Sequence, residues 1–468
     1  MFKLRLKYLS VFFALISILS FFNVVYSYYF NLYLNLDNYF YTLIISSIIS
    51  LIFYKIKISH DKSNIFDKIL TILFGYLLIP LILSIPFYFS IYNFTFLNSF
   101  FESVSGFTST GFSIIDNIKH IDQSLILWRS SIQWVGGFYF LFSIIFLIDI
   151  YDESLKKSLT NFFSFNNSEI VKQTTKIFIL YSSLTFFIFI TLNLFDIRTF
   201  NSFNLAMTII SSGGFLPVND ISMLLNSDIQ KLIFSFLMLI SYFSIFFIYN
   251  LFFIKKKNKD FFYEDYHLVF YLIILISIFF VFFSFNNNFV DIFFIISSSI
   301  SNIGFSTNFS QTHLTFIYII LVIIGGSFFS TSSGLRLIKI YTLFKFSLNQ
   351  ILSFSKPRNI FMSKLAFSKI NFNFEVINKY FLSIVVFIIS LFSLTILLSL
   401  FEINFEQSFK LSVLTLMNTV NSSAYGLDGF DFYNLNFFNK YCLIIFMIIG
   451  RIELLTVLIL LKRFVFKD

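Results

Sequence analysis

The chain alternates long apolar stretches with short polar segments from one end to the other. A helix of about twenty apolar residues can cross a bilayer core of about 30 Å. On this basis the sequence predicts ten membrane spans, at residues 8–30, 39–54, 69–92, 124–150, 174–195, 229–253, 267–285, 314–342, 379–401 and 438–461.

Four further segments are shorter and more polar than these spans. They lie at residues 96–108, 199–211, 290–301 and 406–420, each between two spans and each followed by small polar residues and a glycine. They are too short to cross the bilayer, so we expect each to enter and leave on one side. The predicted fold is an all-α integral membrane protein with four span–pore-loop–span repeats around a central pore. Two extra transmembrane helices precede the repeats, and the predicted bounds are 1–66, 67–155, 170–258, 264–350 and 375–468.

The distribution of the 33 Lys and Arg residues supports this layout. If the four short segments are re-entrant, most basic residues fall on one side, including the clusters at 255–259 and 356–369. Basic loops mark the cytoplasmic side, which predicts cytoplasmic N- and C-termini. If any short segment were a full crossing, every later cluster would change sides.

Composition agrees with a membrane location and narrows the possible functions. Charged residues make up 12% of the chain and mean hydropathy is +0.84, whereas soluble domains carry roughly 25% charged residues. The four His residues lie in separate segments and there is a single Cys, so neither a resident metal nor an internal disulfide is expected. No catalytic motif stands in a credible context, and the chain is not expected to be an enzyme. The net charge of +9 lies mainly in the cytoplasmic clusters and does not indicate nucleic-acid binding.

Several acidic residues fall on the opposite, outer side, among them Asp116, Asp220, Asp291 and Asp428. A negative outer face would raise the local cation concentration at a pore mouth. Ordinary solvated loop charge explains the same pattern equally well.

The four short segments share a local sequence pattern. They contain SGFTSTGFS, ISSGGFL, SNIGFST and SSAYGLD, each with a hydroxyl or amide residue shortly before a glycine that Phe or Leu follows. Non-helical backbone at membrane depth is tolerated where it lines a watery cavity, and its carbonyls can there replace the hydration shell of a cation. Glycine suits such backbone because it accepts positive φ and leaves room beside its neighbours. We therefore expect Gly111, Gly214, Gly304 and Gly426 to surround one cation path.

Longer motifs resemble those of the Trk/Ktr/HKT superfamily of potassium transporters. They are FESVSGFTSTGF at 101–112, WRSSIQWVGG at 128–137, GGSFFSTSSGLRLIKI at 325–340 and IGRIELLT at 449–456. The RIE of the last motif, and the two spans ahead of the first repeat, resemble the Trk-type membrane pore subunit in particular. The resemblance implies potassium uptake through a selectivity filter. The implied filter positions, which would hold K+ as the transported ion, are Thr110, Gly111, Gly213, Gly214, Ile303, Gly304, Tyr425 and Gly426.

The same resemblance implies a location and partners. It places the chain in the bacterial cytoplasmic (inner) membrane, in contact with lipid and as a homodimer. It also implies assembly on a cytosolic ring of nucleotide-binding regulatory subunits.

A candidate gate lies inside the third repeat. In the family, the loop that aligns with residues 325–334 obstructs the cavity below the filter, and the implied gate residues are Gly325, Gly326, Ser330, Thr331, Ser332 and Gly334. A simple helix kink at the glycine pair is the alternative. Arg451 lies near the middle of the last span, where a charge is costly and needs a partner. We expect it to hydrogen-bond carbonyls of this loop and to hold the gate shut.

Two other functions remain open on the sequence. A sodium or weakly selective monovalent cation transporter would have the same fold, although some relatives that prefer sodium carry serine where this chain has Gly111. A secondary carrier would show two matching halves, whereas this sequence shows four units.

Overall fold

A computed structural model describes residues 4–56, 65–148, 170–253, 262–283, 288–307, 314–354, 374–401, 403–452 and 456. The predicted basic clusters at 255–259 and 356–369, and the last part of the span predicted at 438–461, lie outside these residues.

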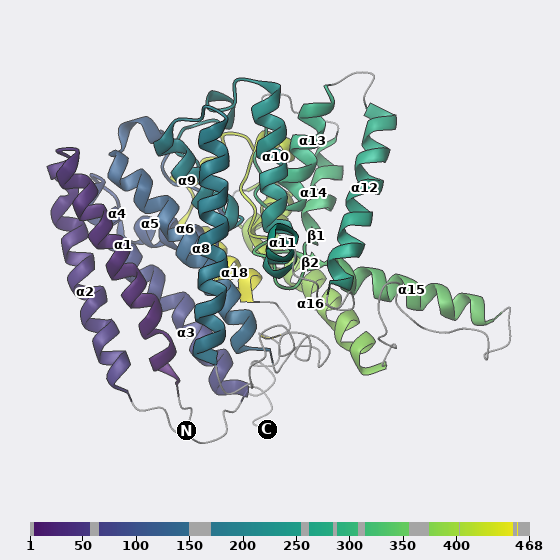
Figure 1. Cartoon of the computed structure of the whole chain (residues 1–468). Helices are drawn as coiled ribbons and strands as arrows, with labels where there is room; N and C mark the ends of the chain where they lie inside the picture. Colours follow the sequence, from purple (N-terminus) through teal and green to yellow (C-terminus); the bar gives the residue numbers. More distant parts are fainter. Residues whose placement is uncertain are drawn as a thin grey trace.

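The two N-terminal helices form an antiparallel pair at one edge of the bundle (Figure 1). A single 3₁₀ turn, Leu6–Tyr8, precedes helix α1 (Ser10–Tyr29), and a second, Tyr33–Asn35, leads into α2 (Leu36–Lys55). α1 also packs on helix α6 (Gln123–Phe146) of the first repeat, which joins the pair to the rest of the molecule.

Four units of similar plan follow, each with a first helix, a short helix and a second helix. The first helices are α3 (Ile65–Leu83) with α4 (Ile85–Ser90), α8 (Ile170–Leu194), α12 (Tyr263–Phe283) and α16 (Phe374–Ser399). The short helices are α5 (Phe96–Phe107), α9 (Thr199–Ile210), α13 (Phe289–Ile300) and α17 (Phe405–Leu416). The second helices are α6 (Gln123–Phe146), α10 (Asp228–Tyr242) with α11 (Ile245–Phe253), α14 (Thr315–Ile323) with α15 (Leu337–Ser353), and α18 (Phe437–Ile452). The predicted fold class is confirmed.

Two of the predicted spans that form second helices are not continuous. The span at 229–253 breaks between α10 and α11 at Phe243 and Ser244. The span at 314–342 is interrupted by a loop, whose ends pair as two short parallel strands, β1 (Ile324–Gly325) and β2 (Leu335–Arg336). Beyond this loop α15 extends sideways from the body of the molecule (Figure 1).

The units close into a ring because each second helix packs on the short helix of the next unit. α6 contacts α9, α10 contacts α13, α14 contacts α17, and α18 contacts α5. Each short helix also packs on a first helix of its own unit. The ends of the short helices are thereby brought around one common axis.

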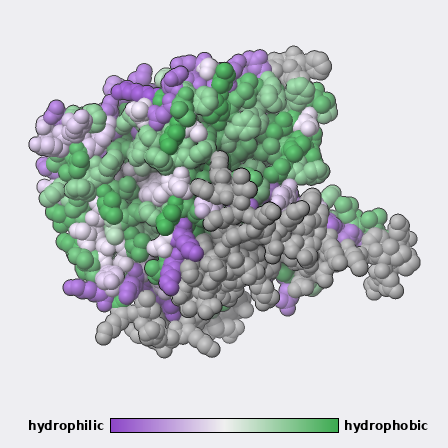
Figure 2. Space-filling view, viewed as in Figure 1, coloured by the Kyte–Doolittle hydropathy of each residue, from purple (hydrophilic) through white to green (hydrophobic). Residues whose placement is uncertain are grey.

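On the face shown in Figure 2, apolar residues form a broad band, and hydrophilic residues gather along its upper edge. Among the described residues, six helical stretches are long and apolar enough to cross a membrane. They are the two N-terminal helices and the first helix of each unit. The second helices are interrupted, more polar or more deeply buried; every described residue of α6 except Gln123 is buried. The chain is therefore a multi-pass membrane protein.

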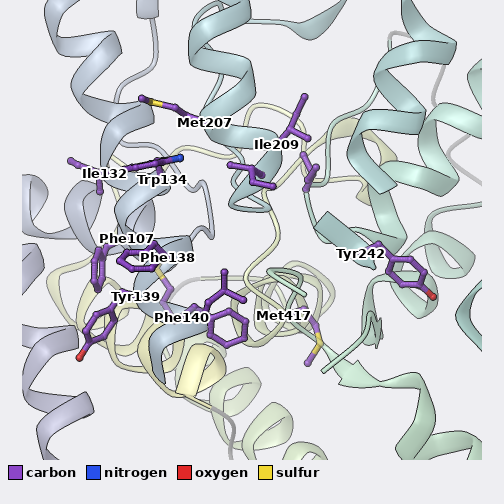
Figure 3. Packing of buried hydrophobic residues seen from close by; sticks show 14 of the residues in the cluster. Phe107, Ile132, Trp134, Phe138, Tyr139, Phe140, Met207, Ile209, Tyr242 and Met417 are labelled. Atoms are coloured by element: carbon purple, nitrogen blue, oxygen red, sulfur yellow. The ribbon is translucent and has the colours of Figure 1, made fainter. Parts of the chain in front are cut away.

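The interior between α5 and α6 is largely aromatic. Phe107, Phe138 and Tyr139 lie together there (Figure 3), and the ring centroids of Phe107 and Tyr139 are 5.3 Å apart. The Tyr139 hydroxyl donates to the Ile72 carbonyl at 2.9 Å, so this buried polar group has its partner. This packing fixes the C-terminal end of the first short helix.

Candidate functional site

All four short helices end in a turn of the same geometry. A non-glycine residue of positive φ follows each helix: Ser109 (φ 60), Ser212 (φ 56), Asn302 (φ 58) and Asn418 (φ 48). Hydroxyl and amide side chains tolerate or locally support this conformation better than apolar ones. The chain then leaves the helix toward the common axis.

The backbone hydrogen bonds of these turns establish which residues correspond. The residue after each positive-φ position donates its N–H to the carbonyl five residues earlier. The bonds run from Thr110 to Ser105 (2.9 Å), from Gly213 to Thr208 (2.8 Å), from Ile303 to Ser298 (3.1 Å) and from Thr419 to Leu414 (2.9 Å). The next residues, Gly111, Gly214, Gly304 and Val420, are therefore equivalent positions in the four units.

In the fourth unit the equivalent pair is not the expected one. Tyr425 and Gly426 lie six residues beyond the equivalent pair Thr419 and Val420, in and after a 3₁₀ turn, Ser423–Tyr425. The Tyr425 hydroxyl lies 3.2 Å from Ser299 Oγ, and Gly426 is exposed. Gly426 adopts φ 68 because it ends that turn, so the glycine signal arose from a different structural requirement. The other predicted positions, from Thr110 to Gly304, all lie in the first three turns.

Hydrogen bonds link neighbouring turns into a ring. Ser212 Oγ donates to the Ser301 carbonyl, which joins the second turn to the third. Asn302 Nδ2 donates to Thr419 Oγ1 at 3.2 Å, and Asn418 Nδ2 donates to Thr110 Oγ1 at 3.0 Å. These contacts join the third turn to the fourth and the fourth to the first.

Arg451 bridges the remaining pair. Its Nη2 donates to Ser109 Oγ at 3.3 Å and to the Ser211 carbonyl at 3.4 Å, so it connects the first turn to the second. The guanidinium also lies over the Phe140 ring, 4.2 Å from its centroid. The order of the turns around the axis is thus first, second, third, fourth, with the second opposite the fourth.

A cavity of about 870 Å³ opens above the ring. Gly111, Gly214, Gly304 and Val420 line its floor, and four acids line its walls: Asp116, Asp220, Asp428 and Asp431. Burial alone would raise the pKa of Asp431, but hydrogen bonds from Asn434 and from the Tyr433 N–H hold that pKa below its usual value. Such carboxylates raise the local concentration of cations at the mouth of the ring. Asp291, in contrast, pairs with Lys231 at 2.8 Å.

The ring is supported from behind by polar side chains that the sequence analysis did not identify. With its amide oxygen toward the second turn, Gln133 accepts from the N–H groups of Gly214 (3.0 Å) and Phe215 (2.9 Å). In the first unit, Glu102 accepts from the Ile114 N–H at 2.8 Å and pairs with Arg129 at 3.0 Å. Glu102 and Gln133 lie within the motifs at 101–112 and 128–137, but the motifs alone do not identify the partners of these side chains.

The loop between β1 and β2 lies against the break in the second unit. The N–H of Ser327 donates to the Tyr242 carbonyl (3.0 Å), and the N–H of Ile245 donates to the Phe329 carbonyl (3.2 Å). Thr331 Oγ1 donates to the Ile210 carbonyl at 2.7 Å, at the end of a short helix. The loop therefore sits directly beneath the ring and replaces helical hydrogen bonds that the break leaves open.

Glycines allow the loop to approach this closely. A Cβ on Gly325 would lie 2.1 Å from the Ser333 carbonyl oxygen, and one on Gly326 would lie 2.2 Å from that of Tyr242. Gly334 has φ 88. The predicted gate residues thus share one compact segment, and Ser330 and Ser332 hydrogen-bond one another at 2.9 Å.

Two charged side chains hold the loop, and neither was among the predicted gate residues. Arg336 Nη1 donates to the carbonyls of Ser327 (2.7 Å) and Ser332 (3.0 Å). Glu264 Oε2 accepts from the Phe328 N–H at 3.1 Å. Arg336 thus makes the carbonyl contacts expected of Arg451.

Arg451 contacts the loop in another way. Its Nη1 donates to Ser333 Oγ at 2.6 Å, so the contact is to a hydroxyl instead of the expected carbonyls. Ser333 Oγ in turn donates to Asn418 Oδ1 at 3.3 Å. Because Asn418 also bonds Thr110, the loop and the ring belong to one hydrogen-bonded network.

Comparisons with known proteins agree with this architecture. A TrkH family profile, described as a cation transport protein, matches residues 286–465. An uncharacterised cation transporter of Methanocaldococcus jannaschii is 24% identical over 421 residues, covering 84% of this chain and 81% of that protein. The Trk system potassium uptake protein TrkG of Escherichia coli is 24% identical over 399 residues, covering 80% of each.

The fold has a close match among solved structures. The potassium transporter TrkH from Vibrio parahaemolyticus superposes with a TM-score of 0.80 over 97% of both chains, at 19% sequence identity. All of these matches are transport proteins, which confirms the prediction that the chain is not an enzyme.

Proposed function

We propose that the chain is a Trk-type cation transport protein that takes up potassium across the cytoplasmic membrane. The ions pass through the ring of four turns, which acts as the selectivity filter. The observation that carries this proposal is the common backbone geometry of the turns, which meet at one axis below an acidic cavity. Backbone carbonyls at such an axis can replace the hydration water of a cation.

Growth of a potassium-uptake-deficient bacterial strain at limiting potassium tests the proposal. We expect the wild-type chain to restore growth. Gly304→Ala should fail to restore it, because φ at Gly304 is 87 and an added Cβ would lie 2.8 Å from the Val420 carbonyl oxygen. Absence of rescue by a wild-type chain that is inserted in the membrane would contradict the proposal.

We further propose that residues 325–334 form the gate. The loop lies directly below the ring, and Arg336, Glu264 and Arg451 hold it there. A loop held by a few hydrogen bonds between two helix ends can change position without unfolding the surrounding helices. Opening would require Arg451 to release Ser333.

For assembly we propose a homodimer in the bacterial inner membrane, with both termini cytoplasmic, on a cytosolic ring of nucleotide-binding regulatory subunits. The exposed apolar residues of α15, among them Phe344, Leu348 and Ile351, support contact with a second copy or with lipid. Mass measurement of the detergent-solubilised protein, alone and with the regulatory subunits of a Trk system, tests this. A monomer that binds no such subunit would contradict it.

A second candidate function is weakly selective transport of monovalent cations, including sodium. The specific observation that favours it is Val420, which stands where the other three turns have glycine. Competition of rubidium uptake by potassium and by sodium separates the two functions.

A further inference from the structure

The ring is not uniform, because one of its four equivalent positions carries a side chain. A Cβ on Gly214 would lie 2.4 Å from the Cβ of Val420 and 3.0 Å from its Cγ2. A Cβ on Gly304 would lie 3.0 Å from Val420 Cγ1. The two methyl groups of Val420 therefore point toward different turns.

The order of the turns around the axis shows that the Val420 side chain reaches across the ring. The second turn is not a neighbour of the fourth, since hydrogen bonds join the second to the third and the third to the fourth. Contact between Val420 and Gly214 therefore reaches across the ring. The isopropyl group stands in the cross-section through which an ion must pass.

The side chain has little freedom to leave this position. A β-branched residue has a strongly restricted χ1, and here its methyl groups abut Gly214 and Gly304. Among the described residues, Gly111 and Gly304 have positive φ, whereas Gly214 and Val420 do not. The backbone at the fourth position thus accepts a valine without left-handed strain.

We propose that Val420 is a selectivity-determining residue that lowers both potassium flux and the preference for potassium over sodium; this rests on the proposed transport function. Methyl groups cannot take the place of hydration water, so a passing cation retains water on the side of the fourth turn. Selection by dehydration weakens when an ion keeps part of its shell.

The test is uptake of rubidium into proteoliposomes that contain the purified chain, with potassium or sodium as competitor. We expect Val420→Gly to raise rubidium uptake and to increase the preference for potassium over sodium by about tenfold, or about 1.4 kcal/mol, because the ion can then exchange more of its hydration water for backbone carbonyls. Val420→Ala should fall between Val420→Gly and wild type. If Val420→Gly does not fold stably, the comparison of Val420→Ala with wild type still tests the proposal.

Val218→Gly is the matched control, because Val218 is half-buried and lines the same cavity outside the ring. It should leave uptake and competition unchanged. If wild type transports and neither Val420 variant changes flux or preference, or if Val218→Gly changes them equally, the role of Val420 is overturned. If none of the variants, wild type included, moves any monovalent cation, the proposed transport function itself is overturned.

Discussion

Replacement of Arg451 by glutamine tests how the loop is held. Arg451 donates three hydrogen bonds to described residues, and of these the 2.6 Å contact to Ser333 reaches the loop. A hydrogen bond to a charged group contributes about 1.5–3 kcal/mol. At about 1.4 kcal/mol per factor of ten, loss of this contact increases the population of released loop by about 10- to 100-fold.

Rubidium uptake into proteoliposomes, normalised to reconstituted protein, is the appropriate assay. We expect Arg451→Gln to raise the initial rate, by up to the same factor where opening limits transport. Ser333→Ala removes the same contact from the loop side while the buried charge remains, and it should act in the same direction. Ser109→Ala removes only a contact to the ring and should not raise the rate.

The result that refutes this reasoning is an unchanged or lower rate in Arg451→Gln at equal protein level. An equal rise in Ser109→Ala and Ser333→Ala would also refute it, because the effect would then come from the ring and not from the loop.

Three further substitutions test the packing and the register. Gly136→Ala places a Cβ 1.9 Å from the Phe107 carbonyl oxygen, and such overpacking costs about 1–3 kcal/mol. The melting temperature in detergent should therefore fall, and an unchanged value would contradict the close approach of α5 and α6. Glu102→Gln breaks the buried ion pair with Arg129, at a cost of about 3–5 kcal/mol, and should reduce the yield of monodisperse protein. A yield and melting temperature equal to those of wild type would argue against the ion pair. Gly426→Asn should leave rubidium uptake unchanged, because asparagine accepts positive φ and the position lies outside the ring; a loss of uptake would restore Gly426 as a filter residue.

The spans and short helices were predictable because the length of an apolar segment decides whether it can cross the bilayer. The sidedness of the basic residues then required the short segments to be re-entrant. The helix breaks at Phe243 and within 325–334 were harder to predict from the sequence. The first depends on hydrogen bonds such as that from the Ile245 N–H to the Phe329 carbonyl, which joins two different units.

The first three ring positions could be found from glycine, but the fourth could not. Val420 occupies that position, and the nearby Gly426 satisfies an unrelated turn. The better signal is the polar residue of positive φ, Ser109, Ser212, Asn302 or Asn418, which follows each short helix by two residues. Gln133 and Glu264 act through contacts with residues distant in sequence, whereas Arg336 bonds the Ser327 and Ser332 carbonyls of its own loop.

A structure of the protein in rubidium, with the ion located by anomalous scattering, tests directly whether the ring of four turns binds the transported ion. We expect a rubidium peak on the axis of the four turns, within reach of the backbone carbonyls of the first three turns at Gly111, Gly214 and Gly304. An empty axis in a protein that transports rubidium, with the ion bound elsewhere, would contradict it.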